Sequence, residues 1–234
     1  MRLFLMVPLF KSIVFFIVCF PVIALAADPQ LILSSSKSSA QALVYFSQSV
    51  VFKKQNLLIA LHGLRQTKQE TYVELKNVAD ELGAVLLCPQ GSDFEQGYIR
   101  TPVDDRQIIL EFHTYLAQKY QIKYENTIVL GFSRGGNFAV ELGVLYPEKF
   151  KNIVCVFGFF NKHIYSMAEA KKKELGISKF LFITGDNDQS LPSLTNGYNF
   201  LQKLNVKVDL KVYKDLIHSY PPDLAAQIRA VFLR

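Results

Sequence analysis

The chain alternates between two patterns of apolar residues from about Leu57 to its end. Short runs of four to seven residues, rich in β-branched and other apolar side chains, predict buried strands. Between them, apolar residues recur three or four positions apart, which predicts amphipathic helices. The predicted strands are Gln41–Phe46, Leu57–Leu61, Ala84–Cys88, Thr127–Leu130, Asn152–Phe157, Phe180–Thr184 and Val206–Val212. The predicted helices are Gln69–Leu82, Asp104–Tyr120, Gly135–Leu145, Ser193–Leu204 and Pro222–Phe232, with a further helical stretch at Met167–Leu175.

This alternation predicts the α/β class, with a mostly parallel, twisted sheet and helices on both of its faces. Single residues support two of the predicted helix ends. Asp104 suits the positive N-terminal end of one helix, and Gly83 suits the C-cap of another. Ligands of such open sheets bind beyond the carboxyl ends of the strands. We therefore expect the reactive residues to follow directly after strands.

The first 26 residues have the pattern of a secretory signal peptide and are set aside from the fold. Arg2 and Lys11 form a basic region, Ser12–Ile23 is an apolar core, and Ala24-Leu25-Ala26 offers a small-x-small cleavage site. An uncleaved membrane anchor is the alternative, but the core is shorter than the ~20 residues that a span needs. We predict cleavage after Ala26, export to the periplasm or the medium, and a single domain at residues 27–234.

The charge balance is mildly basic and evenly spread. The formal net charge of +6 falls to +4 when Arg2 and Lys11 leave with the signal peptide. The run Lys171-Lys172-Lys173 is interpreted as a solvated helix face, because no aromatic residues are interleaved with it as in a nucleic-acid site. We predict no nucleic-acid partner, and contact with a membrane only through the signal peptide during export. The sequence does not indicate an oligomeric state.

Two cysteines remain after the signal peptide, and both lie inside predicted strands. These are Cys88 and Cys155. Export would permit a disulfide, but the predicted fold places two strands between them, so we predict two buried free thiols. The sequence contains no His-Glu-x-x-His motif, no cluster of cysteine and histidine, and no Walker or dinucleotide-binding loop. It therefore predicts neither a metal nor another cofactor.

The most informative motif follows the predicted strand at Thr127–Leu130. Gly131-Phe132-Ser133-Arg134-Gly135-Gly136 places a Gly-x-Ser-x-Gly pattern between a strand and a helix, which is the signature of a nucleophile elbow. Only small neighbours allow the backbone to fold back so sharply, and the glycines supply them. The alternative is a glycine-rich turn whose serine only caps a helix.

A serine hydroxyl needs a base, and the base needs an orienting acid. In this architecture the chain order is serine, acid, histidine. His218 follows the last predicted strand and fits the base. The loop after the penultimate strand offers Asp186 and Asp188. We favour Asp188, because Asp186 comes directly after Gly185 and is expected to brace the turn.

An oxyanion hole requires two backbone N–H groups directed at the developing negative charge. We expect one from Arg134, directly after the serine. We expect the other from Leu64, in the loop after the strand Leu57–Leu61, where Gly63 permits a turn. His62 is interpreted as a structural residue whose ring holds this loop by a hydrogen bond. Three separate loops thus carry the required chemistry in the required order.

These motifs resemble the α/β-hydrolase superfamily and, within it, the small phospholipase/carboxylesterase and dienelactone-hydrolase-like group. The resemblance covers about residues 57–234. It rests on Leu61-His62-Gly63, the serine hexapeptide, the loop at His218, and the segment from Gly185 to Pro192, whose Gly-x-x-Asp spacing matches the acid turn at Asp188. It implies an α/β-hydrolase fold and hydrolysis of carboxylic esters through an acyl-enzyme, with Ser133, His218 and Asp188 as the triad.

Two departures bear on the substrate. Many relatives carry glutamine after the serine, where this chain has Arg134. We expect the Arg134 side chain to form a salt bridge on the helix surface; attraction of an acidic substrate is the alternative. The segment His62–Thr67 also resembles secreted feruloyl esterases and polyester depolymerases. The resemblance therefore leaves the subfamily open.

The segment between Phe157 and Phe180 is too short for a separate lid domain. We therefore expect an open site and small or soluble ester substrates. Tyr98, Phe159 and Phe160 are candidates for the acyl pocket, with burial in the core as the alternative. Two other functions stay open: a serine peptidase or amidase with the same triad, and a non-catalytic binding protein of the same fold, in which the triad would be broken.

Overall fold

The computed structural model describes residues 30–36, 38–47 and 56–233. The expected signal peptide lies outside the described residues. None of the helices in the described ranges is long and apolar enough to cross a membrane.

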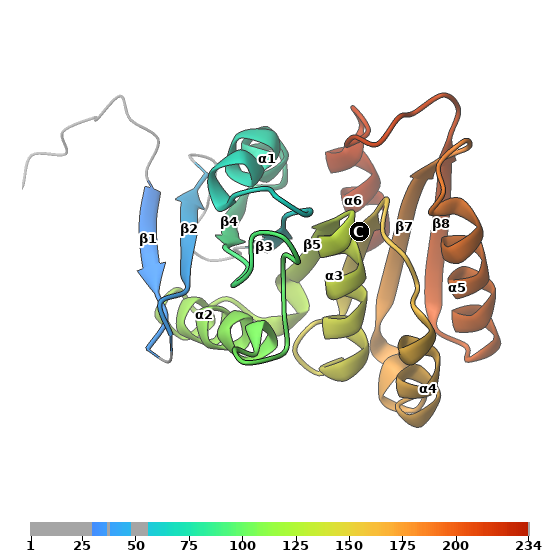
Figure 1. The fold of residues 1–234 in the computed structure, drawn as a ribbon, viewed down its shortest axis with the longest axis horizontal. Coiled ribbons are helices and arrows are strands. Elements are labelled where there is room, and N and C mark those ends of the chain that lie inside the picture. Colours follow the sequence, from blue (N-terminus) through green and yellow to red (C-terminus); the bar gives the residue numbers. More distant parts are fainter. Residues whose placement is uncertain (1–29, 37, 48–55, 234) are drawn as a thin grey trace, which may run out of the picture.

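Within these residues, a single eight-stranded sheet forms the centre, with the order β1-β2-β4-β3-β5-β6-β7-β8 (Figure 1). The edge strand β1 pairs with β2, and β2 with β4, in antiparallel fashion. The other neighbours are parallel. The strands are β1 Gln30–Ser34, β2 Gln41–Phe46, β3 Asn56–Leu61, β4 Ala84–Pro89, β5 Thr127–Phe132, β6 Asn152–Val156, β7 Lys179–Gly185 and β8 Lys207–Tyr213. The predicted mostly parallel sheet is confirmed.

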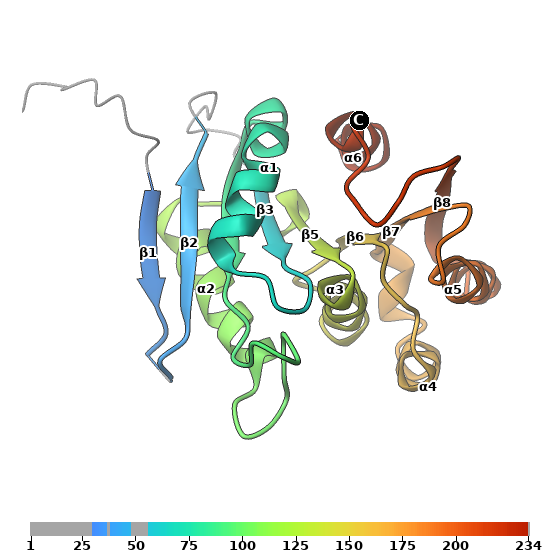
Figure 2. The ribbon, with the colours of Figure 1, turned by 45° about the horizontal axis from the view of Figure 1, so that its top comes forward.

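Helices cover both faces of the sheet, as expected (Figure 2). One face packs against α2, α3, α4 and α5, and the other against α1 and α6. The α-helices are α1 Lys68–Leu82, α2 Asp105–Lys119, α3 Arg134–Leu145, α4 Lys162–Ala170, α5 Leu191–Lys203 and α6 Leu224–Phe232. Two short 3₁₀ helices, η1 Tyr124–Asn126 and η2 Glu174–Ile177, complete the elements. This arrangement is the predicted doubly covered α/β architecture.

Two features differ from the sequence expectation. Strand β1 was not predicted, and the stretch expected as a helix at Met167–Leu175 is α4, which begins earlier at Lys162, followed by η2. The predicted C-cap of the first helix is confirmed: Gly83 follows its last residue, with φ +58° in the left-handed region. Asp104 is the N-cap of α2 and accepts a hydrogen bond from the Arg106 amide.

The cysteine prediction is confirmed. Cys88 lies on β4 and Cys155 on β6, and β3 and β5 run between those two strands. Both thiols are free and buried. Burial raises the pKa of each thiol, that of Cys155 to about 12. Neither sulfur is therefore a reactive thiolate in the folded protein.

Candidate active site

The residues expected to act together follow four strands at the carboxyl edge of the sheet. Leu64 lies after β3, Ser133 after β5, Asp188 after β7 and His218 after β8. This is the edge at which ligands of open α/β sheets bind. The topology therefore gathers at one edge the loops that the sequence singled out.

Ser133 has the backbone of a nucleophile elbow. Its φ of 52° and ψ of −117° lie in a region that residues with a side chain rarely adopt. Its amide donates to the Val156 carbonyl at 2.8 Å, which fixes the turn beside β6. Ser133 occupies the N-cap position of α3, yet its side chain makes no capping hydrogen bond. The capping alternative therefore does not account for this serine.

The glycines of the motif are required by contact with other backbone atoms. A Cβ at Gly131 would lie 2.1 Å from the Gly135 carbonyl oxygen, and a Cβ at Gly135 would lie 2.3 Å from the Leu61 carbonyl oxygen. Both distances are far below van der Waals contact. The elbow thus needs glycine at both positions so that β3, β5 and α3 can approach closely.

The structure brings His218 and Asp188 together. The imidazole Nδ1 lies 3.3 Å from the Asp188 carboxylate oxygen Oδ2. The other carboxylate oxygen accepts the Ser190 amide at 2.7 Å. Burial alone would raise the pKa of Asp188, but the hydrogen bonds from Ser190 and the proximity of His218 outweigh it and lower the pKa. Asp188 is therefore held ionised, in the form that orients and stabilises an imidazolium.

Asp186 has a different role from Asp188. Its carboxylate accepts the Asp215 amide at 3.0 Å and the Asn187 side-chain amide at 3.1 Å. The Asp215 contact joins the loop after β7 to the loop after β8, and the Asn187 contact lies within the first of them, which agrees with the turn-bracing role expected from the sequence. The two loops line an open hollow of about 330 Å³, formed by Asp186, Asn187, Asp188, Asp215, Leu216, Ile217 and His218.

Aromatic contacts position the imidazole relative to the serine. The His218 ring packs against Phe132 and Phe157, with centroid distances of 4.8 and 4.9 Å. Phe132 directly precedes Ser133, so the ring lies over the residue next to the serine. The Ser133 hydroxyl itself has no hydrogen-bond partner among the described residues. The folded chain therefore pairs the acid with the base, and the base contacts the ring of the residue that precedes the serine.

The loop after β3 lies directly against the serine. A Cβ at Gly63 would lie 3.5 Å from the Ser133 Cβ. The His62 ring holds this loop: its Nδ1 lies 2.7 Å from the Gly63 carbonyl oxygen, and its Nε2 accepts the Gly91 amide at 2.9 Å. Nδ1 is therefore the protonated nitrogen, since Nε2 must offer a lone pair. Burial lowers the pKa of His62, which favours this neutral form.

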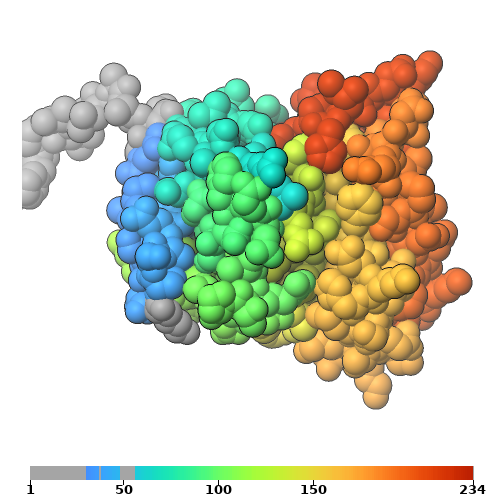
Figure 3. Space-filling view, in the orientation of Figure 1, coloured from blue at the N-terminus to red at the C-terminus, as the bar shows by residue number. Residues whose placement is uncertain are grey.

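Further contacts hold the same loop and were not predicted from the sequence. The Gly63 amide donates to the Gln66 side chain at 2.7 Å, and the Arg65 amide donates to the Phe94 carbonyl at 3.1 Å. The loop after β4 is thus packed onto the loop after β3, and Figure 3 shows its green residues beside the cyan ones. The sequence offers one sign of this packing, the glycine at position 91. In the structure a Cβ there would lie 2.5 Å from the Gly97 carbonyl oxygen, so a larger residue would not fit.

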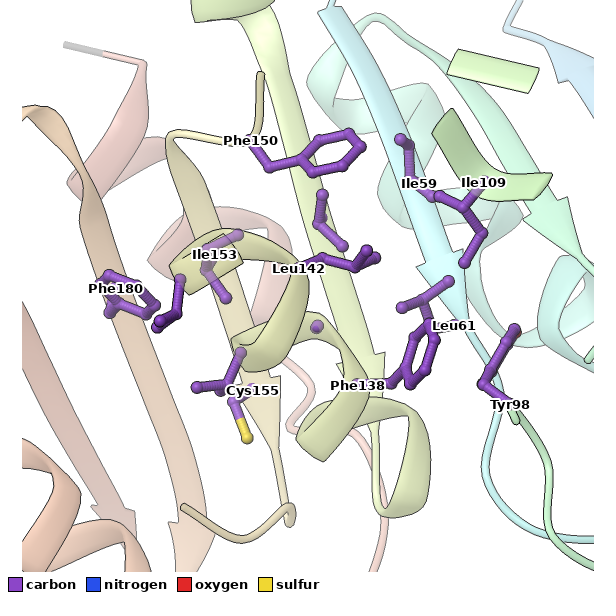
Figure 4. Packing of buried hydrophobic residues seen from close by; sticks show 14 of the residues in the cluster. Ile59, Leu61, Tyr98, Ile109, Phe138, Leu142, Phe150, Ile153, Cys155 and Phe180 are labelled. Atoms are coloured by element: carbon purple, nitrogen blue, oxygen red, sulfur yellow. The ribbon is translucent and has the colours of Figure 1, made fainter. Parts of the chain in front are cut away.

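Two of the three aromatic residues considered for an acyl pocket lie in the core. Tyr98 is 1% exposed and Phe160 is 3% exposed. The Tyr98 hydroxyl donates to the Pro89 carbonyl and accepts the His62 amide, and its ring stacks on Phe138 (Figure 4). Tyr98 therefore stabilises the loop after β3 through its hydrogen bond with the His62 amide. Phe159 is only partly buried and stays a pocket candidate.

The expected salt bridge of Arg134 does not form with any residue that the structure describes. Among the described residues, no carboxylate pairs with its guanidinium and no acceptor receives a hydrogen bond from it. Its position as the first residue of α3 leaves its amide free of an intrahelical partner, as an oxyanion donor requires. No grouping of three or more His, Cys, Asp or Glu side chains within the described ranges could hold a metal ion.

Comparison with known proteins extends these observations. Three solved structures share the fold at 16 to 19% identity. A ferulic acid esterase superimposes with a TM-score of 0.72 at 18% identity, covering 88% of this chain and 97% of its own. The fluorophosphonate-binding serine hydrolase F of Staphylococcus aureus gives 0.70 at 19%, covering 87% and 96%. A phospholipase/carboxylesterase of Dyadobacter fermentans gives 0.65 at 16%, covering 86% and 100%.

A search of curated proteins gives no match. The family model described as phospholipase/carboxylesterase matches residues 107–232, just over half of the chain. The matched region runs from α2 to α6 and includes the serine, the acid and the histidine loops. The eight-stranded sheet and the solved structures that share it give the same fold. The chain belongs to the phospholipase/carboxylesterase family and has the α/β-hydrolase fold.

Proposed function

We propose that this protein is an exported serine carboxylesterase that cleaves small or soluble esters through the triad Ser133, His218 and Asp188. The observation that carries the proposal is the 3.3 Å contact between the His218 Nδ1 and the Asp188 carboxylate, together with the elbow conformation of Ser133. The family supports hydrolase chemistry, and these three residues fit the nucleophile, the base and the acid that this chemistry needs.

The reaction follows the logic of a serine, a base and an acid. His218 takes the proton from the Ser133 hydroxyl as its oxygen attacks the ester carbonyl. Asp188, which is already ionised, stabilises the imidazolium that forms. The alcohol leaves with the proton from His218. Water then enters, gives a proton to His218 and attacks the acyl carbonyl. The carboxylic acid leaves, and His218 returns the proton to the Ser133 oxygen.

The oxyanion of each tetrahedral intermediate needs fixed donors. The amides of Leu64 and Arg134 fit this role. Arg134 is the first residue of helix α3, so its amide lies at the positive end of the helix. Leu64 belongs to the loop that His62 and Gln66 hold against the serine. Rigid donors of this kind do not have to reorganise when charge develops.

An open site supports small or soluble substrates. The segment between β6 and β7 consists of α4 and η2, and α4 packs beside α3 and α5. The side chains of Leu64 and Ile217, next to the reacting groups, are 47% and 81% exposed. A long acyl chain would find little enclosed apolar surface here. Export rests on the signal-peptide pattern of residues 1–26, and N-terminal sequencing of the exported protein tests it.

The first test measures hydrolysis of 4-nitrophenyl acetate, butyrate and palmitate by the purified protein and by Ser133→Ala. We expect turnover of the short esters, little turnover of the palmitate, and loss of activity in the variant. Ser219→Ala is the matched control, because this hydroxyl donates only to the Ile217 carbonyl. Activity on amides but not on esters would indicate a peptidase or amidase. The absence of both activities would indicate a binding protein.

A further inference from the structure

Arg134 differs from the other arginines that the structure describes. Each of the others has an acceptor for its guanidinium. Arg65 pairs with Glu95, Arg100 and Arg106 pair with Glu141, and Arg229 donates to the Glu81 carbonyl. Within the described part of the chain, only the guanidinium of Arg134 has neither a hydrogen-bond acceptor nor a carboxylate partner.

The position of Arg134 makes this isolation informative. It is the first residue of α3, directly after the serine, and it is only partly exposed. The positive end of a helix disfavours a cation, so this arginine does not serve the stability of α3. A partly buried cation without a partner also loses hydration that no group in the described part of the chain replaces. A bound anion would remove both costs.

The side chain of Arg134 extends toward the loops after β3 and β4. A Cβ at Gly97 would lie 3.6 Å from the Arg134 Cγ and 3.7 Å from the Leu64 Cδ2. The stem of the arginine and Leu64 therefore lie together against Gly97, on the oxyanion side of Ser133. The acids of the adjoining loop are engaged elsewhere: Glu95 pairs with Arg65, Asp104 pairs with Arg106, and Asp93 accepts the amides of Glu95 and Gln96.

Charge is distributed unequally across the site. Asp186, Asp188 and Asp215 lie together on the side of β7 and β8. Arg134 extends to the other side, toward β3, which the sheet order separates from β7 by β5 and β6. The three aspartates would repel an anionic group on a bound ester, and the guanidinium of Arg134 would attract it. The site thus has the polarity to orient an anionic substrate.

We infer that Arg134 is a specificity-determining residue that binds a carboxylate carried by the substrate, so that the preferred substrates are esters with a free carboxylate near the cleaved bond. This inference rests on the proposed function, since it concerns the same site. A guanidinium binds a carboxylate by two parallel charge-assisted hydrogen bonds, which also fixes its orientation. The carboxylate belongs to either the acyl or the alcohol part of the ester.

Two matched pairs of esters test the inference. For the acyl part, the pair is the 4-nitrophenyl monoester of glutaric acid and 4-nitrophenyl valerate. For the alcohol part, the pair is 4-acetoxybenzoate and 4-methylphenyl acetate. The readout is the ratio of kcat/KM between the anionic and the neutral ester of a pair. A loss of folded protein lowers both values equally and cancels in this ratio.

We expect the ratio to fall about tenfold to a hundredfold in Arg134→Met for at least one pair, because a charge-assisted hydrogen bond is lost. Arg134→Lys should retain part of the preference, as it keeps the charge but not the fork. Arg65→Met is the matched control, because it removes the same charge from the neighbouring loop. Its ratio should stay near that of the unaltered protein.

The outcomes separate this inference from the proposed function. Turnover of the neutral esters with ratios that Arg134→Met leaves unaltered for both pairs would overturn the inference alone. If none of the four esters is hydrolysed and Ser133 does not react with a fluorophosphonate, the proposed function fails and the inference fails with it. If the ratio falls equally in Arg134→Met and Arg65→Met, the preference for the anionic ester comes from the overall positive charge near the site. That result would overturn the specific role of Arg134.

Discussion

His218 and Asp188 are thirty positions apart in the sequence, and their side chains lie 3.3 Å apart, Nδ1 to Oδ2. The contact joins the loops after β7 and β8, which the parallel pairing of those strands places side by side. Asp186 is two residues closer to the strand and binds a backbone amide of the neighbouring loop. The fold therefore distinguishes two nearby carboxylates by their partners.

This distinction predicts unequal effects of two equivalent substitutions. Asp188→Asn should lower kcat by about 10³- to 10⁴-fold, because the amide no longer stabilises the imidazolium. Asp186→Asn keeps an oxygen that accepts the Asp215 amide, so kcat should change less than about threefold. Steady-state kinetics on 4-nitrophenyl butyrate would measure both. Equal losses in the two variants would argue against Asp188 as the acid.

The buried ring of His62 predicts a loss of catalysis without contact with the substrate. His62→Ala removes the hydrogen bonds to the Gly63 carbonyl and the Gly91 amide. We expect kcat to fall by about tenfold to a thousandfold, because the proposed oxyanion donor, the Leu64 amide, is released from its position. KM should change little. Unaltered kcat in a folded variant would show that the loop keeps its form without the ring.

His113 predicts a loss of stability on acidification. Burial lowers its pKa from 6.5 to about 4 in the folded protein, with a smaller contribution from Lys149. Below pH 6.5 the unfolded chain therefore takes up a proton that the folded chain does not accept until about pH 4. The free energy of unfolding should fall by up to about 3 kcal/mol across this window through His113. Urea unfolding at pH 7 and pH 4.5 measures the change.

A glutamine at this position provides the comparison. His113→Gln does not titrate, so the difference between the two pH values should be smaller than in the unaltered protein. The Nε2 of His113 lies 3.1 Å from the Thr127 hydroxyl, and a glutamine amide can replace that contact. An identical pH dependence in both proteins would exclude His113 as its source.

The glycines of the elbow predict a contrast in stability. Gly135→Ala places a methyl group where the Leu61 and His62 carbonyls already lie, so the free energy of unfolding should fall by at least about 2 kcal/mol. Gly176→Ala should be neutral or stabilising, because nothing lies within 4 Å of the added carbon. Thermal unfolding of both variants tests this. A stable Gly135→Ala protein would contradict the packing described.

The sequence predicted most of the sheet because buried strands leave a strong pattern. Strands such as β5 and β7 are almost continuously apolar, and each is followed by a turn. Strand β1 escaped prediction because it is a short edge strand with partly exposed residues and a single partner, β2. The early start of α4 was missed because only Ile164 and Ala168 of that helix are buried.

The candidate triad was also accessible from the sequence, since its members follow strands in a fixed order. The environments of single side chains could not be predicted from the sequence. Tyr98 and Phe160 are buried by residues far away in the chain, and no local pattern separates such a core aromatic from a pocket aromatic. The isolation of Arg134 depends likewise on which distant acids already have partners. Packing between remote segments decides these cases.

The strained backbone conformation of Ser133 lowers thermal stability at the residue that is proposed as the nucleophile. Glycine adopts a φ of 52° without the steric cost that a serine side chain incurs there, which is about 1–3 kcal/mol for residues held in such regions. Ser133→Gly therefore relieves strain while it removes the proposed nucleophile. A selection that rewards resistance to heat alone would favour this inactive protein over the active one, so directed evolution of this scaffold has to monitor turnover in every round.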